Sequence, residues 1–140
     1  MKSWAPPKTA IDEDNNMIYS DDYGVGKIAG IKLDPATGHM TAAFVLDDRT
    51  TCLQALYGPK DKRVLGVSRI NPNATPEQLE KGTYTEQATW RDAATGRLLA
   101  QSAYYEPMTL NTLITPAFGG GFYFPTGKGF IRLTVTPTSV

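Results

Sequence analysis

Near the start of the chain, carboxylate and amide side chains crowd into the run Asp12-Glu13-Asp14-Asn15-Asn16. Oxygen ligands in the pattern Asp-x-Asp-x-Asn are those with which a calcium-binding loop begins. Such a loop needs a glycine at the next position, and Met17 stands there instead. We therefore expect a solvated hairpin turn. Asp12 and Asp14 are the candidate metal ligands, and calcium is the one cofactor that the sequence suggests.

The chain contains one histidine, His39, and one cysteine, Cys52. A catalytic triad would need His39. It directly follows Gly38 in a predicted outer hairpin, where we expect it to be exposed and out of reach of a central site. Cys52 lacks a second histidine that would activate it as a nucleophile, so we expect a buried, small apolar residue. No catalytic residue is assigned, and the sequence leaves open whether the protein is an enzyme.

Two glycine-rich segments match phosphate-binding loops only in part. Gly24-Val25-Gly26 followed by Gly30 has the wrong spacing for a dinucleotide-binding fingerprint, and no helix is predicted after it. Gly119-Gly120-Gly121 lacks the Lys-Ser/Thr ending of a phosphate loop. Neither segment predicts a nucleotide cofactor.

Aromatic side chains concentrate in the C-terminal half of the chain. Because alternate residues of a strand point to opposite faces, some of these rings must face the core and others outward. We expect core packing, and the alternative is an exposed stacking surface for a sugar or a peptide. The residues concerned are Trp90, Tyr104, Tyr105, Phe118, Phe122, Tyr123 and Phe124.

Composition limits the classes of partner. Of the 140 residues, 14 are basic and 14 acidic, so the formal net charge is zero and nothing indicates an electrostatic grip on nucleic acid or an anionic membrane. No apolar stretch is long enough to span a bilayer. The first residues, 1–7, lack the apolar core of a signal peptide, and the compartment stays open. A single cysteine excludes an internal disulfide and a Cys-based zinc cluster.

The pentapeptide Asp34-Pro35-Ala36-Thr37-Gly38 recurs with one change as Asp92-Ala93-Ala94-Thr95-Gly96. Each copy follows one apolar run and precedes another, which is typical of a turn that joins two strands. Short apolar runs and polar turns alternate along the rest of the chain. An internal repeat of this kind predicts an all-β fold built from similar four-stranded units.

Three units follow from these runs. The first spans 8–48, and the second spans 51–107 with an insertion at 71–83. Residues 75–82 of the insertion carry the signals of one short capped helix. The third unit spans 109–136 and ends before a fourth strand. The expected strands are 9–11, 17–20, 27–33, 39–46, 52–57, 63–70, 84–91, 98–105, 110–118, 122–124 and 130–135.

The acidic run up to Asp21, the Gly26-Lys27-Ile28 entry into a strand and the two Asp-x-Ala-Thr-Gly turns resemble the NHL and SMP-30 (gluconolactonase-like) class of β-propellers. The resemblance covers nearly all of the chain outside the insertion. It implies one propeller segment over 1–140, with about two and three-quarter antiparallel blades of four strands each, from the C-terminal part of a larger ring. The metal-binding acids and asparagines of the lactonases have no matching motif here. A small β-barrel or sandwich is the alternative fold.

Three blades cannot close a ring, because known propellers have at least about four and each blade needs a neighbour on both faces. We therefore expect association with further blades or with a second copy, which would give about six blades. The spare segment Lys2-Ser3-Trp4-Ala5 is the candidate strand to cover the outer edge at 130–135.

The expected function is a binding or interaction scaffold, with its site at the ring centre or on the loop face. Two alternatives stay open. One is a lactonase-like or other hydrolase propeller whose active residues lie in other blades, and the other is a small ligand-binding β-barrel. The sequence does not determine the ligand, the reaction, the number of blades or the oligomeric state.

Overall fold

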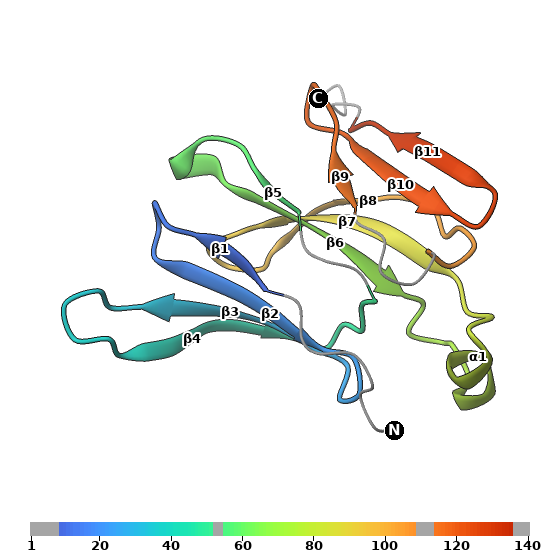
Figure 1. The fold of residues 1–140 in the computed structure, drawn as a ribbon, viewed down its shortest axis with the longest axis horizontal. Helices are drawn as coiled ribbons and strands as arrows, with labels where there is room; N and C mark the ends of the chain where they lie inside the picture. Colours follow the sequence, from blue (N-terminus) through green and yellow to red (C-terminus); the bar gives the residue numbers. More distant parts are fainter. Residues whose placement is uncertain (1–8, 52–54, 109–113, 136–140) are drawn as a thin grey trace.

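The computed structural model describes residues 9–51, 55–108 and 114–135. Within them the chain is all-β apart from two short helical segments, and it forms three antiparallel sheets of three or four strands. We name these sheets I, II and III in chain order. In Figure 1, sheet II lies between sheet I, at the lower left, and sheet III, at the upper right. The all-β class predicted from the sequence is confirmed.

Sheet I is a four-stranded meander in which each strand pairs with the next along the chain. Its first hairpin turns at the acidic run, as expected. A bulge between Gly30 and Ile31 shifts the pairing of its last two strands. The strands are β1 (Ala10–Asp12), β2 (Met17–Asp22), β3 (Lys27–Leu33) and β4 (Met40–Leu46).

Sheet II has the same order of pairing, with the insertion between its second and third strands. A 3-10 turn, η1 (Lys60–Lys62), precedes the second strand. The last strand ends at Gln101, whereas the sequence predicts an end at Tyr105. Tyr105 forms only an isolated β-bridge with Glu86. The strands are β5 (Ala55–Tyr57), β6 (Val64–Ile70), β7 (Glu86–Asp92) and β8 (Leu98–Gln101).

The insertion contains the predicted helix, α1 (Pro76–Lys81). The Thr75 hydroxyl accepts a hydrogen bond from the Gln78 N–H, and the Gln78 side chain accepts one from the Thr75 N–H. This capping box satisfies backbone donors that the first turn of a helix leaves free. Gly82 ends the helix in the left-handed conformation, with φ of 66°. The local signals for this helix are therefore confirmed.

Sheet III has three strands in the order β11-β10-β9. Part of the expected strand 110–118 lies outside the described residues. Of the rest only Thr115–Pro116 pairs, because the Ala117 N–H turns back to the Gly121 carbonyl (2.8 Å). Among the described residues the last strand pairs on one side alone, and the segment expected to cover it, 2–5, lies outside them. The strands are β9 (Thr115–Pro116), β10 (Phe122–Thr126) and β11 (Gly129–Leu133).

The two copies of the pentapeptide form the same turn between the third and fourth strands of sheets I and II. In each, the aspartate carboxylate accepts a hydrogen bond from the threonine hydroxyl three residues later, at 2.8 Å. Those hydroxyl bonds and backbone N–H groups hold the pKa of Asp34 and Asp92 below its usual value. Gly38 and Gly96 close the turns with φ of 71° and 73°, which favours glycine at this position.

Sheet II is the middle layer, because sheet I covers one of its faces and sheet III the other. Leu65 and Val67 of β6 pack with Tyr19 of sheet I. Gly66 lies between them and faces sheet III, where the Phe122 ring sits directly over it. A Cβ atom at Gly66 would lie 2.0 Å from the ring, so no larger residue fits. Alternate residues of β6 therefore contact sheet I on one face and sheet III on the other.

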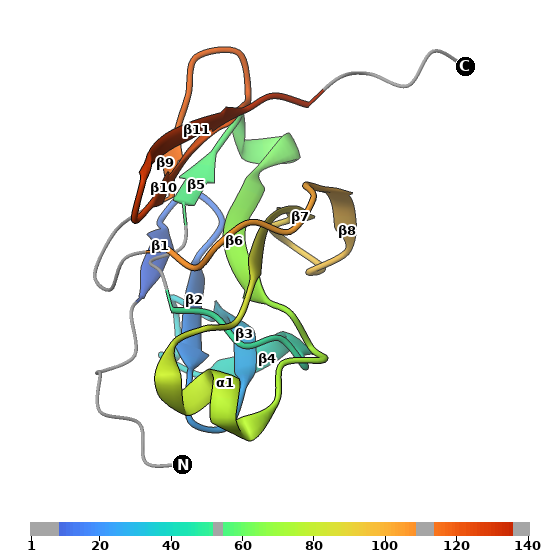
Figure 2. The same cartoon turned by 90° about the vertical axis from the view of Figure 1, so that its right-hand side faces the viewer.

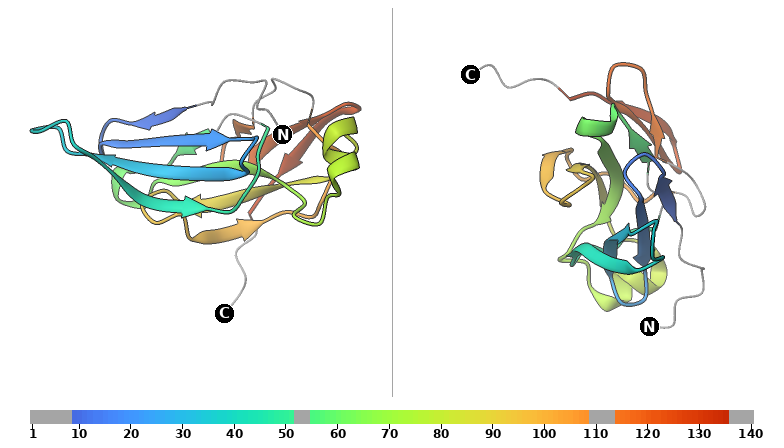
Figure 3. Two further views of the ribbon diagram at one scale, coloured as in Figure 1. Left: turned by 90° about the horizontal axis from the view of Figure 1, so that it is seen from below. Right: turned by 90° about the vertical axis from the view of Figure 1, so that its left-hand side faces the viewer.

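The first strands of the three sheets lie side by side, since β1 contacts β5 and β5 contacts β9. The fourth strands of sheets I and II, β4 and β8, are mostly exposed at the opposite edge. Figure 2 and Figure 3 show the layers from three further sides. None of the three sheets closes on itself within the described residues.

Candidate functional site

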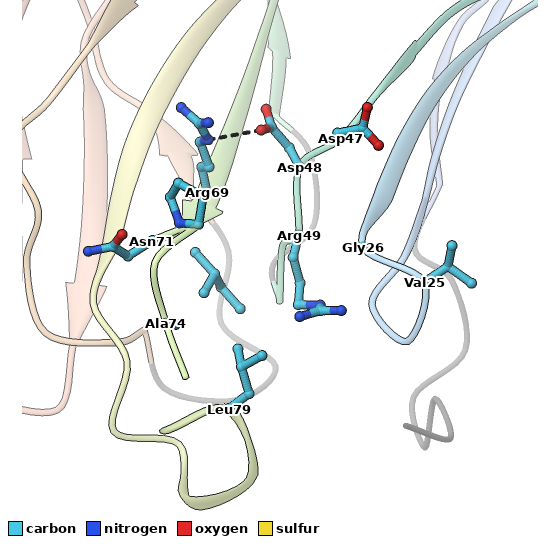
Figure 4. Close-up of a pocket in the computed structure, with 11 residues that line it drawn as sticks. Val25, Gly26, Asp47, Asp48, Arg49, Arg69, Asn71, Ala74 and Leu79 are labelled. Carbon is cyan, nitrogen blue, oxygen red and sulfur yellow. Dashed lines mark ion pairs between the residues drawn. The ribbon is translucent and has the colours of Figure 1, made fainter. Parts of the chain in front are cut away.

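A charged cleft of about 220 Å³ lies at the end of the seam between sheets I and II. Four segments line it: the β2–β3 turn, the crossover at 47–49 that leaves β4, the end of β6, and the insertion that follows β6. Figure 4 shows Arg69 and Asp48 at one end of the cleft and Leu79 at the other. The cleft is therefore built from loops that three ordered elements hold in place.

The crossover at 47–51 is tied to the end of β6. The Arg49 carbonyl accepts a hydrogen bond from the Ile70 N–H (2.8 Å), and the hydroxyl oxygens of Thr50 and Ser68 lie 2.9 Å apart. These bonds fix the segment that directly follows Asp48. The polar crossover is therefore held in one position, where it forms a wall of the cleft.

Asp48 lies between two arginines of sheet II. Its Oδ1 lies 2.8 Å from Arg69 Nε, and its Oδ2 lies 2.5 Å from Arg91 Nη2. Asp48 and Arg91 are 6% and 7% exposed. Burial lowers the pKa of Arg91, and the charge of Asp48 opposes that shift. One buried carboxylate thus balances two guanidinium groups.

Arg69 is the arginine whose donors remain available. Its side chain is 26% exposed, and no acceptor in the described part of the chain binds its Nη1 or Nη2. Arg49, in contrast, donates from Nε to the Tyr23 carbonyl (2.8 Å) and from Nη2 to the Gly24 carbonyl (3.3 Å). Its guanidinium also lies 5.6 Å from the centre of the Tyr23 ring. Arg49 therefore fastens the β2–β3 turn, while Arg69 lines the cleft with its guanidinium beside Asp48 (Figure 4).

The charges of the residues that line the cleft balance, because Arg49 and Arg69 stand with Asp47 and Asp48. Asp47 is already paired with Lys27, and Asp48 is shared. Two further basic residues, Lys27 and Arg91, lie outside the lining as partners of these aspartates, so four basic side chains stand near two carboxylates. An anion is the charge type that this excess of basic side chains favours.

The lining of the cleft also includes the aliphatic residues Ile70 and Leu79. Ile70, at the end of β6, is 3% exposed. Leu79 is the one residue of α1 that is not fully exposed. The insertion at 71–83 therefore contributes an apolar wall as well as a helix.

The predicted metal ligands lie at the other end of the same seam, around Arg63. Arg63 donates from Nε to Asp12 Oδ2 (3.2 Å) and from Nη2 to Asp14 Oδ2 (2.6 Å). Asn15 also donates to Asp12 Oδ2, at 2.8 Å. Asp12 is 3% exposed, so the expected solvated turn is wrong for this residue, whereas the Asp14 side chain is 62% exposed. A guanidinium group, not an open ligand set, faces both carboxylates.

The pKa of Asp12 follows from these contacts. Burial raises it, but the hydrogen bonds from Asn15 and Arg63, with the Arg63 charge, outweigh burial and hold the pKa below its usual value. Nowhere in the described residues do three His, Cys, Asp or Glu side chains gather as a metal site. Calcium binding at Asp12 and Asp14 stays a prediction.

His39 is exposed after the β3–β4 turn, and its carbonyl accepts a hydrogen bond from the Asp34 N–H (2.8 Å). Cys52 lies outside the described residues, so its burial stays a prediction. Gly24-Val25-Gly26 forms the β2–β3 turn and Gly119-Gly120-Gly121 precedes β10, so a strand follows each of them.

Glu86 is a fully buried carboxyl group that the sequence does not single out. Its Oε1 accepts a hydrogen bond from the Thr51 hydroxyl (2.7 Å), and its Oε2 accepts one from the Met108 N–H (2.8 Å). Burial raises the pKa of Glu86, and these two bonds counteract only part of the effect. A glutamate at the start of a strand is usually exposed, so the strand pattern contains no signal for its burial.

The aromatic residues divide between core and surface. Trp90 stacks on Phe122 at 4.5 Å between ring centres, and Phe124 is also buried. Phe118 is 99% exposed, and Tyr104 and Tyr123 are each 41% exposed, so the expected core packing is wrong for these three. A second hollow of about 280 Å³ lies beside Trp90 and has no charged residue in its lining.

Compared with known proteins, the chain matches no family model, no curated protein and no solved structure. The resemblance to the NHL and SMP-30 class therefore stays a prediction. Across the part of the chain that the structure describes, no helix has the length and apolar character needed to cross a membrane.

The cluster of Asp48, Arg69 and Arg91 is absent from the sites predicted by the sequence. A sequence feature that could have pointed to it is the alternation along β6. Arg63, just before the strand, and Arg69 share a face with the apolar Leu65 and Val67. Charged residues on the buried face of a strand need partners, and their presence predicts ion pairs inside the seam.

Proposed function

We propose that this protein is a β-propeller segment that acts as a binding scaffold and completes its ring with a second copy of itself. The observation that supports this most directly is the stacking of three similar sheets with their first strands side by side. Blades of a propeller surround a central axis in this way. Among the described residues, the first and the last of these sheets each have a neighbouring sheet on one face only.

The outer face of sheet I, which points away from sheet II, is aliphatic. Strand register places Ile11, Ile18 and Ile31 in one row across it. Val45, paired with Ala29, extends the face. Ile11 is 62% exposed and Val45 is 56% exposed. A contiguous apolar face of this kind marks a surface for association.

The outer face of sheet III, which points away from sheet II, carries aromatic side chains. Tyr123 alternates with the buried Phe122 and Phe124, so it points outward. Phe130, on the neighbouring strand, is 80% exposed. The two outer faces therefore differ in chemistry, one aliphatic and one aromatic.

The existing seam between sheets I and II shows how such faces meet, because Tyr19 there packs with Leu65 and Val67. Tyr123 of one copy against Ile11 and Ile18 of the next would reproduce this pairing of an aromatic with aliphatic residues. Contact between two different faces is head-to-tail. Two copies close such a contact into a ring of six sheets with a two-fold axis.

The test uses one charged substitution on each outer face, Ile11→Asp and Phe130→Asp. Both side chains are exposed in the single chain, so each variant should keep its circular dichroism spectrum. We expect sedimentation analysis to show weaker association for both variants. Leu99→Asp is the matched control, because Leu99 is 46% exposed on β8, away from both outer faces.

Association that is unchanged in both Ile11→Asp and Phe130→Asp would contradict the head-to-tail ring. Loss in one variant alone would also contradict it, since every head-to-tail contact uses both faces.

A further inference from the structure

We infer that the cleft between sheets I and II binds a small organic anion, namely a carboxylate with a short apolar tail. This inference rests on the proposed role as a binding scaffold but not on the ring, because every residue that lines the cleft belongs to one chain. Its support comes from three features: Arg69 nitrogens that no acceptor binds among the described residues, the two basic partners of the lining aspartates, and an apolar side chain at the far end.

Arg69 provides the recognition group. A guanidinium group binds a carboxylate through two parallel N–H donors, and this planar match is what distinguishes arginine from lysine. The Asp48 carboxylate lies against Nε and fixes the side chain, so Nη1 and Nη2 are the donors left for a ligand. Because Asp48 is shared with the buried Arg91, it cannot neutralise Arg69 fully.

The neighbouring charges favour an anion over a cation. Asp47 pairs with Lys27, and Asp48 with two arginines, so both carboxylates already have cationic partners. Partial burial strengthens these interactions, because the side chains around Asp48 exclude most of the water.

The far end of the cleft limits the rest of the ligand. Leu79 lies at the end opposite Arg69 (Figure 4), and Ile70 is a second aliphatic residue of the lining. The volume of about 220 Å³ is below the range of roughly 300–1,000 Å³ of pockets for drug-sized ligands. A branched aliphatic tail of a few carbons suits this space.

The experiment is a titration of the isotope-labelled full chain with isovalerate, followed by NMR. We expect saturable shifts of backbone signals at Arg49, Arg69 and Leu79, with a Kd of about 1 mM. Isovaleramide has the same shape without the charge and should cause no saturable shift. Inorganic phosphate tests the bare anion and should bind more weakly than isovalerate.

Variants locate the binding. Arg69→Gln and Arg69→Lys should each weaken isovalerate binding about tenfold or more, because both lose the fork. Leu79→Asp should weaken binding of isovalerate. The matched control is Arg97→Gln, an exposed arginine after the β7–β8 turn, which should bind as the unmodified chain does.

No saturable shift with isovalerate would overturn the inference, as would equal binding of isovaleramide or of phosphate. Unchanged affinity in both Arg69 variants would do so too. Should Leu79→Asp not fold, the Arg69 variants still decide. Because sedimentation reads the ring and the titration reads the cleft, failure of one is distinguishable from failure of the other.

Discussion

One face of β6 carries an arginine near each end, and the two arginines have different surroundings. Arg63, Leu65, Val67 and Arg69 occupy alternate positions that face sheet I, over a span of about 20 Å. Arg63 meets two carboxylates, whereas Arg69 shares the single carboxylate of Asp48 with another arginine. Leu65 and Val67, which lie between the two arginines, belong to one hydrophobic core.

Arg63 and Arg69 differ in how many acceptors surround the guanidinium group. We call Arg63 a structural clamp, because acceptors from two sheets bind its guanidinium group. Every nitrogen of the Arg63 guanidinium has a partner, because Nη1 donates to the Gly58 carbonyl (2.5 Å) while Nε and Nη2 bind the two aspartates. Arg63 thus joins the first hairpin of sheet I to the first hairpin of sheet II. Among the described residues, no acceptor binds the two Nη atoms of Arg69.

The largest effect should come from Asp48→Ala. This variant leaves the buried Arg91 without its counter-charge, and breaking a buried ion pair from one side typically costs 3–5 kcal/mol. We expect the free energy of unfolding to fall by about 3 kcal/mol. Urea unfolding at fixed protein concentration measures it. Asp47→Ala is the control, because the Asp47 side chain is 86% exposed. If the free energy of unfolding of this control fell by more than about 0.5 kcal/mol, the special role assigned to Asp48 would be contradicted.

Arg63→Met should have the next largest effect. It keeps the apolar stem but removes the clamp and leaves the buried Asp12 with Asn15 as its remaining side-chain partner. We expect a loss of about 2 kcal/mol in the free energy of unfolding, measured as above. A loss no larger than that of Arg97→Met would show that the two aspartates do not depend on this arginine.

Acid should weaken the clamp in a predictable direction. The pKa of Asp12 is lower in the folded chain than its unfolded value of about 3.9. Its contribution is therefore present above about pH 4 and is lost as the pH falls through the folded pKa. Below pH 4 the free energy of unfolding should drop less steeply for Asp12→Asn than for the unmodified chain. Equal slopes would contradict the assigned Arg63–Asp12 contact.

The smallest effect on stability should come from Arg69→Gln. Asp48 keeps Arg91, and Arg69 is partly exposed, so we expect a change below about 1 kcal/mol. The same variant should abolish most of the isovalerate binding. A stability loss as large as that of Asp48→Ala would make Arg69 a second clamp and remove the contrast between the two ends.

Local signals in the sequence predict the elements well. Alternation and turn residues place most of the strands, and the Thr75–Gln78 capping box places α1. The pentapeptide turns are equally local, since within five positions the aspartate carboxylate accepts from the threonine hydroxyl and the aspartate carbonyl accepts from the glycine N–H.

The sites depend on partners that are distant in the chain. Asp12 meets Arg63 over a separation of 51 residues, and Asp48 meets Arg91 over 43. A strand pattern shows that Arg63 and Arg69 face the seam, but not which carboxylate each one finds. The burial of Asp12 and the whole Asp48 cluster therefore become visible only when two sheets are packed together.

The mass of the unmodified chain across a dilution series, measured by light scattering, tests the central proposal most directly. The outer faces of sheets I and III should bring two copies together, so we expect twice the mass of the chain at high concentration and a decline towards one chain on dilution. A single-chain mass at every concentration, together with one cooperative melting transition, would contradict the six-sheet ring.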